Sequence, residues 1–140
     1  NLSDINACLL EDQILGYKKL SNIKKKIYLK LKKKLSYLKQ IEFPSNLRNK
    51  DRDFYLFPIG VHKKYRNKLI EHLLKKKIFV TVNFKPINEL NYYKKKYKKI
   101  NCPVSQKWGS EQISLPFHSK LTIKEIDKIT GEIESFFRKF

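Results

Sequence analysis

The sequence predicts a mixed α/β domain, in which a long N-terminal helix is followed by about three mostly antiparallel strands covered by helices. Three observations support this fold class. Apolar residues recur at helical spacing from residue 3 to about 39, and short β-branched and aromatic runs occupy residues 54–61 and 79–84. Between these two runs, Tyr65–Lys77 again shows helical periodicity. Strands flanked by amphipathic helices favour one sheet on which the helices pack.

The first helix is expected to span residues 3 to about 39. Ser3 is a candidate N-cap, and burial of one apolar stripe must hold the helix, because lysines spaced by four repel one another. Gly16 lies inside this span and costs roughly 1 kcal/mol relative to alanine, which predicts a bend or break near Gly16–Ser21. The stripe consists of Ile5, Leu9, Ile23, Ile27, Leu31, Leu35 and Leu38.

Two strands and a helix are expected in the middle of the chain. Pro44–Asp53 is a polar loop, and the following Phe54–Val61 is rich in the aromatic and β-branched residues that strands favour. Pro58 cannot donate a ladder hydrogen bond, so its position predicts an edge strand or a bulge. A helix at Tyr65–Lys77 and a second strand at Phe79–Phe84 follow.

The last third of the chain is expected to complete the α/β layer. Asn88–Lys99 is predicted as a loop or broken helix, followed by a short helix near residues 105–111 and a strand at Gln112–Leu115. Thr122 and Glu125 form a capping box, in which a hydroxyl and a carboxylate each satisfy an orphan backbone N–H at a helix start. The closing helix then carries apolar residues at helical spacing: Ile123, Ile126, Ile129, Ile133, Phe136 and Phe137.

Length and composition indicate one domain over residues 1–140. A chain of 140 residues with 41% apolar content can bury a core. It contains no apolar run near the roughly 20 residues that a membrane-spanning helix needs. Cys8 and Cys102 show no disulfide or metal spacing, which favours reduced thiols in a cytoplasmic protein. The chain contains no methionine, even at position 1, and we interpret it as a processed chain or a fragment.

The net charge of +19 raises nucleic-acid binding as an alternative function. Three tyrosines lie among five lysines in Asn91–Lys99, and aromatics between cations can stack bases and grip phosphates. Only four of the 32 basic residues are arginine, the residue that forks onto phosphates and guanine edges. Nucleic-acid binding is therefore expected to be weak and insensitive to base sequence. The simpler interpretation of this segment is a solvated charged run whose tyrosines pack down.

The residue types that carry catalysis do not form a recognisable group in this sequence. His62 and His72 are expected at the surface, and His118 lacks a serine, cysteine or carboxylate partner in a catalytic arrangement. Trp108 is expected to be a core anchor for its helix. With four glycines in all, the chain offers no glycine-rich phosphate loop, and no metal site is predicted.

Four blocks of the chain resemble, in the same order, the C-terminal part of one enzyme family. The most particular is Cys102–Ile129, where a proline-led helix, a Ser-Leu-Pro-Phe-His turn and a closing helix follow one another. The others are Asn1–Ala7 with Gln13-Ile14, then Phe54–Ile59 with Arg66–Leu73, and then Ile78–Pro86. Together they resemble the DegT/DnrJ/StrS family of pyridoxal-phosphate-dependent sugar aminotransferases, from the first residue to about Phe137.

This resemblance implies the C-terminal small domain of a fold-type I aminotransferase acting on nucleotide-linked keto-sugars in amino-sugar and cell-surface polysaccharide biosynthesis. Residues 1–39 would be the linking helix region and 40–140 the α/β subdomain. The Schiff-base lysine would lie upstream of this chain, in a large domain that is missing here, so the chain alone should not hold pyridoxal phosphate or transaminate. The intact enzyme would be a homodimer. A degenerate homologue without catalytic function remains a further alternative.

The resemblance also implies candidate site residues. Asn1 aligns with the arginine of the family's Gly-x-Asn-x-Arg loop, near the cofactor phosphate. Asn83 and Asn88 occupy positions where many members carry histidines near the substrate, and Lys85 lies between them. Asparagine can still hydrogen-bond a sugar hydroxyl, whereas the simpler alternative is that both asparagines satisfy turn backbone.

The start of the first helix is expected to lack a partner within this chain. In the family this segment joins the two domains near the dimer interface, so Ile5, Cys8, Leu9 and Leu15 would contact the large domain or a second subunit. Residues 1 to about 18 should therefore project from the domain, while Ile23, Ile27, Leu31 and Leu35 pack on the sheet. Exposed apolar surface of this kind usually marks an interaction site.

Overall fold

The computed structural model describes residues 2–44, 54–97 and 100–140. In chain order its elements are α1 (Asp4–Leu35), β1 (Ile41–Glu42), β2 (Phe57–Val61), α2 (Lys63–Lys75), the 3₁₀ helix η1 (Ile87–Glu89), α3 (Asn91–Lys96), α4 (Pro103–Glu111), β3 (Gln112–Leu115) and α5 (Ile123–Phe137). The predicted fold class is confirmed: a long first helix precedes a three-stranded antiparallel sheet with helices packed on it.

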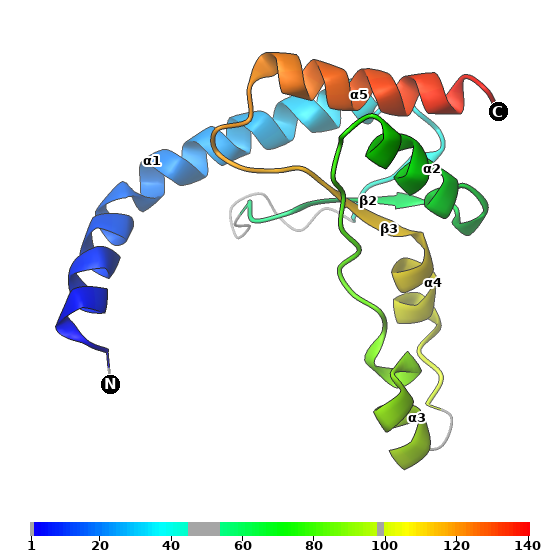
Figure 1. Ribbon diagram of the computed structural model, residues 1–140, viewed down its shortest axis with the longest axis horizontal. Coiled ribbons are helices and arrows are strands. Elements are labelled where there is room, and N and C mark those ends of the chain that lie inside the picture. Colours follow the sequence, from blue (N-terminus) through cyan, green and yellow to red (C-terminus); the bar gives the residue numbers. More distant parts are fainter. Residues whose placement is uncertain (1, 45–53, 98–99) are drawn as a thin grey trace.

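Helix α1 begins at the predicted cap, since the Ser3 hydroxyl oxygen accepts a hydrogen bond from the Asn6 amide at 3.4 Å. The helix then runs to Leu35 without interruption. Of the predicted bend or break near Gly16–Ser21, the break is absent, and the helix curves gradually along its length (Figure 1). One glycine costs only about 1 kcal/mol in a helix, and the hydrogen-bond ladder on either side of it persists.

The sheet has the order β1–β2–β3, and both strand pairs are antiparallel. The predicted strand at Phe79–Phe84 is wrong, because only Thr81 forms a bridge, with Ser114 of β3. Two residues later the Asn83 amide donates instead to the side-chain oxygen of Gln112, at 2.8 Å, so a side chain replaces the backbone ladder. The third strand of the sheet is β1, which the sequence did not indicate.

Pro58 lies in the central strand of the sheet, which corrects the prediction of an edge strand. Its place is nevertheless compatible with its missing N–H. Strand β1 pairs only with Gly60 and Val61, whereas Pro58 pairs with Ser114 on the β3 side. Among the described residues, β2 therefore has no second strand partner at the level of Pro58, and no ladder hydrogen bond is lost there.

The core lies between the sheet and one layer of helices, formed by α2, α5 and the C-terminal half of α1 (Figure 1). Tyr28 of α1 packs its ring against Phe54 and Phe57, with ring centroids 4.9 and 5.0 Å apart. Eight core side chains have no exposed surface, namely Leu31, Leu35, Phe57, Ile59, Leu69, Leu73, Ile113 and Ile133. Burial of these α1 side chains in the core stabilises the helix, as expected from its apolar stripe.

The first half of α1 projects from this core, as predicted (Figure 1). Ile5 is 76% exposed and Leu15 75%, whereas Ile27 is 8% exposed and Leu31 fully buried. The same apolar stripe is thus covered at one end of the helix and open at the other. Within the described ranges, no helix has the length and apolarity needed to cross a membrane.

The predicted capping box at the start of α5 is present. The Thr122 amide donates to the Glu125 carboxylate at 2.8 Å, and the Glu125 amide donates to the Thr122 hydroxyl oxygen at 3.3 Å. The pKa of Glu125 is held below its ordinary value of 4.5 by two hydrogen bonds from Thr122. The bond from the backbone N–H has the larger effect, and the bond from the hydroxyl has the smaller one. A carboxylate with a lowered folded-state pKa stabilises the fold above its unfolded-state pKa and loses this contribution as the pH falls.

We therefore expect the Glu125→Gln variant to lose less stability on acidification than the wild type. Glutamine can still accept the hydrogen bond of the Thr122 amide but does not titrate. Melting temperatures at neutral pH and at about pH 3 would measure the difference. An equal loss in both proteins would mean that the capping carboxylate does not contribute to the acid sensitivity of the fold.

Candidate functional site

The candidate site residues predicted from the sequence lie along one extended segment between the sheet and a protruding lobe. This α3–α4 lobe consists of η1, α3 and α4, and it extends away from the sheet and from α5 (Figure 1). Its helix α4 still contacts α2, because the Arg66 side chain donates to the Ser110 carbonyl oxygen at 3.0 Å. Asn83 and Lys85 precede the lobe, and Asn88 lies within η1. Asn1 lies outside the described residues.

Asn83 is held on the sheet by a polar network around Gln112. The Gln112 side chain, which is 1% exposed, accepts from the Asn83 amide and donates to the Ser114 hydroxyl oxygen at 2.6 Å. The Asn83 side-chain oxygen accepts from the Thr81 hydroxyl at 2.9 Å. Buried polar groups need partners, so this network fixes where the chain leaves the sheet. The signal for Gln112 in the sequence was a glutamine at the start of a short strand that continues Ile-Ser-Leu.

Asn88 closes the base of the lobe and does not meet Asn83. Its side-chain nitrogen donates to the Ile100 carbonyl oxygen at 2.9 Å, which joins the two ends of the α3 segment. This contact agrees with the simpler interpretation, in which the asparagine satisfies turn backbone. Asn88 also lines an open hollow of about 460 Å³. Lys85 is exposed on the segment between the two asparagines.

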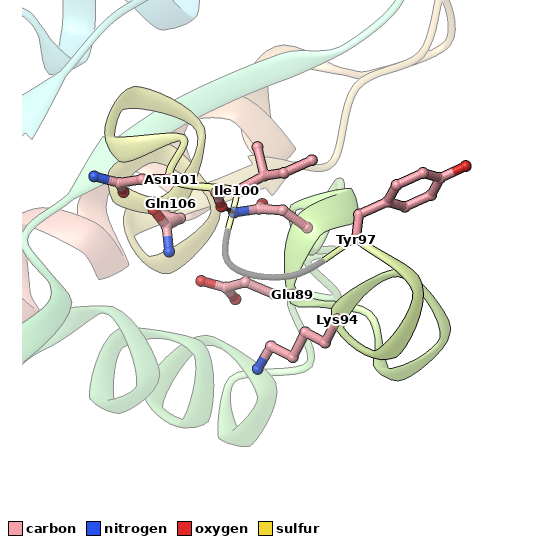
Figure 2. A pocket seen from close by; sticks show the side chains of 7 residues that line it. Glu89, Lys94, Tyr97, Ile100, Asn101 and Gln106 are labelled. Atoms are coloured by element: carbon pink, nitrogen blue, oxygen red, sulfur yellow. Dashed lines mark hydrogen bonds between the residues drawn. The ribbon is translucent and has the colours of Figure 1, made fainter.

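The walls of this hollow carry both hydrogen-bond donors and acceptors. Figure 2 shows Glu89, Asn101 and Gln106 gathered on one side, with the Tyr97 ring pointing away from them. Lys94 contributes an ammonium group from α3. Carboxylate, amide and ammonium groups together can bind a polyhydroxylated ligand, because each of its hydroxyls both donates and accepts. None of these residues was singled out by the sequence, apart from those in the tyrosine–lysine segment.

The tyrosine–lysine segment forms the short helix α3, and its tyrosines do not pack down onto the core. Tyr92 is 63% exposed, and Tyr93 and Tyr97 stack on each other with ring centroids 6.2 Å apart. The Lys96 ammonium lies over the rings of both Tyr92 and Tyr97. The interpretation of this segment as a charged run with inward-packed tyrosines is therefore wrong for its tyrosines. Lys98 and Lys99 lie outside the described residues.

The remaining residues weighed from the sequence lie outside the two hollows of the α3–α4 lobe. His62 caps α2. Trp108 lies half-buried against Gly60 and is not among the core side chains of the described residues, so the predicted core anchor is wrong. His118 is exposed, as is Cys8. His72 departs from the expected surface placement, because its ring is half-buried between α2 and α5 and lies 3.0 Å from the Glu132 carboxylate.

The described residues do not by themselves fit a pyridoxal phosphate site. Schiff-base chemistry needs a lysine held in a defined cavity, a carboxylate for the pyridine nitrogen and a cup of phosphate donors. Every lysine in the described ranges is exposed or half-buried on the surface, and no glycine-rich loop is present. Those ranges also hold no group of three or more His, Cys, Asp and Glu side chains placed to bind a metal ion.

The family model of the DegT/DnrJ/EryC1/StrS aminotransferases matches residues 1–134. The chain belongs to this family. It is 26% identical, over 89 residues, to the UDP-4-amino-4,6-dideoxy-N-acetyl-beta-L-altrosamine transaminase of Helicobacter pylori. That match covers 61% of this chain but 24% of the transaminase.

Solved structures agree in fold with the family assignment. The putative sugar aminotransferase Spr1654 from Streptococcus pneumoniae, in its PMP form, is 26% identical and superimposes with a TM-score of 0.88. The match covers 99% of this chain and 36% of that one. Helicobacter pylori PseC, an aminotransferase involved in the biosynthesis of pseudoaminic acid, is similar in fold, with a TM-score of 0.82 at 22% identity. The chain spans 38% of PseC.

Proposed function

We propose that this chain is the C-terminal small domain of a pyridoxal-phosphate-dependent aminotransferase acting on nucleotide-linked keto-sugars. The match to the family model over residues 1–134 carries this proposal. It favours the aminotransferase over the alternative of a basic nucleic-acid-binding module. The intact enzyme would transfer an amino group from glutamate or another donor in cytoplasmic amino-sugar and cell-surface polysaccharide biosynthesis. Residues 1–39 would link the two domains, and 40–140 would form the α/β subdomain.

The missing part of the enzyme would be the large domain. The chain covers 24% of the Helicobacter pylori transaminase and 36% of Spr1654, which leaves room for such a domain in the whole protein. The open apolar half of α1 is a surface suited to contact it, or a second subunit of a homodimer. Ile5, Leu9 and Leu15 are each more than half exposed there.

The large domain would also supply the cofactor's lysine. A PLP form of Spr1654 is similar to this chain with a TM-score of 0.85 at 25% identity. When bound, pyridoxal phosphate serves as the electron sink for transfer of the amino group. This chain's own residues would position the substrate. The amides of Asn83 and Asn88 would bind sugar hydroxyls, with Lys85 near the negative charge of the nucleotide. Asn1 would lie near the cofactor phosphate.

Basic and amide groups of the α3–α4 lobe suit the nucleotide end of such a substrate. Lys94 lines the same hollow as the amides of Asn101 and Gln106, and the other two lysines of α3 are exposed. A basic rim raises the encounter rate with a pyrophosphate, because opposite charges steer association. These groups would bind and orient the substrate without a role in proton transfer.

The test compares the chain alone with the protein that includes the sequence encoded before Asn1. The longer protein should give a saturable cofactor absorbance that one lysine substitution removes, and it should aminate a nucleotide-linked keto-sugar. The chain alone should do neither. A saturable absorbance of the chain alone that disappears on replacing one of its own lysines would contradict the proposal. Cofactor binding by the longer protein without amino transfer would favour the degenerate homologue.

A further inference from the structure

Lys77 occupies a backbone conformation that lysine rarely adopts. It follows the C-terminal end of α2 with a φ of 59°, the one positive φ at a non-glycine residue among the described residues. The Lys77 amide donates to the Leu74 carbonyl and the Ile78 amide to the Leu73 carbonyl, each at 2.9 Å, which closes the helix end. Glycine is the usual residue at such a position, because a Cβ there is strained. A bulky side chain at such a strained position points to a role for that side chain.

The strained turn forms one wall of a hollow of about 250 Å³ between α2, the β3–α5 loop and α5. Its floor is apolar, since Ile78, Leu121 and Ile129 are each less than 10% exposed. At the rim, the turn directs Phe79 outward, where its ring is 75% exposed. An apolar floor beside an exposed ring suits one aromatic or branched apolar group.

Cationic groups line the same hollow. Lys77 and Lys128 approach it from the end of α2 and from α5, and neither has an ion-pair partner within the described part of the chain. Glu125, the acidic residue of the lining, already accepts the amide and hydroxyl hydrogen bonds of Thr122 in the capping box. Glu125 keeps its negative charge, but two ammonium groups against one carboxylate leave the lining with a net positive charge that attracts an added anion, with the imidazole of His118 beside them.

We propose that this hollow binds a small carboxylate that carries an aromatic or branched apolar body. The body lies on Ile78, Leu121 and Ile129 under the Phe79 ring, and the carboxylate lies between the ammonium groups of Lys77 and Lys128. The site is separate from the hollow lined by Asn88 in the α3–α4 lobe, since the two share no residue. The proposal therefore does not depend on the proposed function.

The probe is 3-phenylpropionate, and its neutral amide, 3-phenylpropanamide, is the control ligand. Backbone amide shifts of the full chain are followed by NMR at neutral pH. For a ligand of about eleven non-hydrogen atoms, the expected Kd is several millimolar. Shifts should concentrate at residues 77–79 and 121–129, and the amide should bind several-fold more weakly. Added salt should weaken the carboxylate's binding, because the ammonium groups are partly exposed.

Substitutions distinguish specific binding of the carboxylate in the hollow from its nonspecific attraction to a positively charged surface. Lys128→Gln should raise the Kd about threefold to fivefold, whereas Lys124→Gln, on the same helix but outside the hollow, should leave it unchanged. Lys77→Gly should weaken binding to a similar extent without lowering the melting temperature, because glycine relieves the positive φ. Equal binding of acid and amide, equal effects of Lys124→Gln and Lys128→Gln, or no localised shifts would each overturn the proposal.

Discussion

Replacing Leu31 by alanine is expected to lower the free energy of unfolding by about 2–5 kcal/mol. Leu31 lies on α1 with no exposed surface, among the core side chains that join this helix to the sheet and to α5. Removing a fully buried leucine loses its transfer free energy and leaves a cavity. Urea unfolding followed by circular dichroism would measure the change.

Leu9→Ala is the matched control, because it changes the same side chain on the same helix. Leu9 is 58% exposed, and the expected change is within about 0.5 kcal/mol. The contrast tests the distinction between the covered and open halves of α1. A loss at Leu9 comparable to that at Leu31 would mean that the helix start packs against this domain or a second copy in solution.

The second large effect is expected at Gly109 in α4. A Cβ added at this position would lie 2.5 Å from Cδ and 2.7 Å from Cγ of Pro86. The proline ring is tied to its own backbone and cannot swing aside, so the chain must shift or the contact between α4 and the Pro86 segment must open. Gly109→Ala should therefore destabilise the protein by about 1–3 kcal/mol, the usual cost of overpacking.

Gly131→Ala is the control, because its expected change in stability has the opposite sign. Gly131 lies in α5, and an added Cβ there meets nothing within 4 Å. Alanine in a helix interior is favoured over glycine by about 0.5–1 kcal/mol, so this variant should be more stable. Thermal melts would show whether the melting temperature falls for Gly109→Ala and rises for Gly131→Ala. If Gly109→Ala were also stabilising, Pro86 would not contact α4 in solution.

Elements whose signals are local could be predicted from the sequence. The stripe of α1, the strand around Phe57, the capping box at Thr122 and the periodicity of α5 each depend on residues close along the chain. The segment Phe79–Phe84 was misassigned because β propensity describes a residue's fit to a pleated surface and does not supply a partner strand. Strand β3 pairs along its whole length with β2, and its backbone bridges this segment only at Thr81.

The candidate site was only partly predictable for a related reason. The family resemblance indicated Asn83 and Asn88, and the structure provides a wall of a hollow for Asn88 and a sheet contact for Asn83. Glu89, Asn101 and Gln106 meet only because the chain folds back between η1 and α4, which no local pattern specifies. The role of Gln112 likewise depends on a residue 29 positions away in sequence.

The uninterrupted course of α1 makes this helix a lever arm. Its packed part begins near Ile23, and the stretch from there to Asp4 is about 28 Å long at 1.5 Å per residue. A tilt of about 10° at the packed end would displace the tip by roughly 5 Å, given that length. Repacking around Leu31 and Leu35 would thus be magnified at the far end of the helix. The side chains that pack α1 on the sheet therefore also determine the position of the N-terminal end of the helix relative to any partner that it contacts.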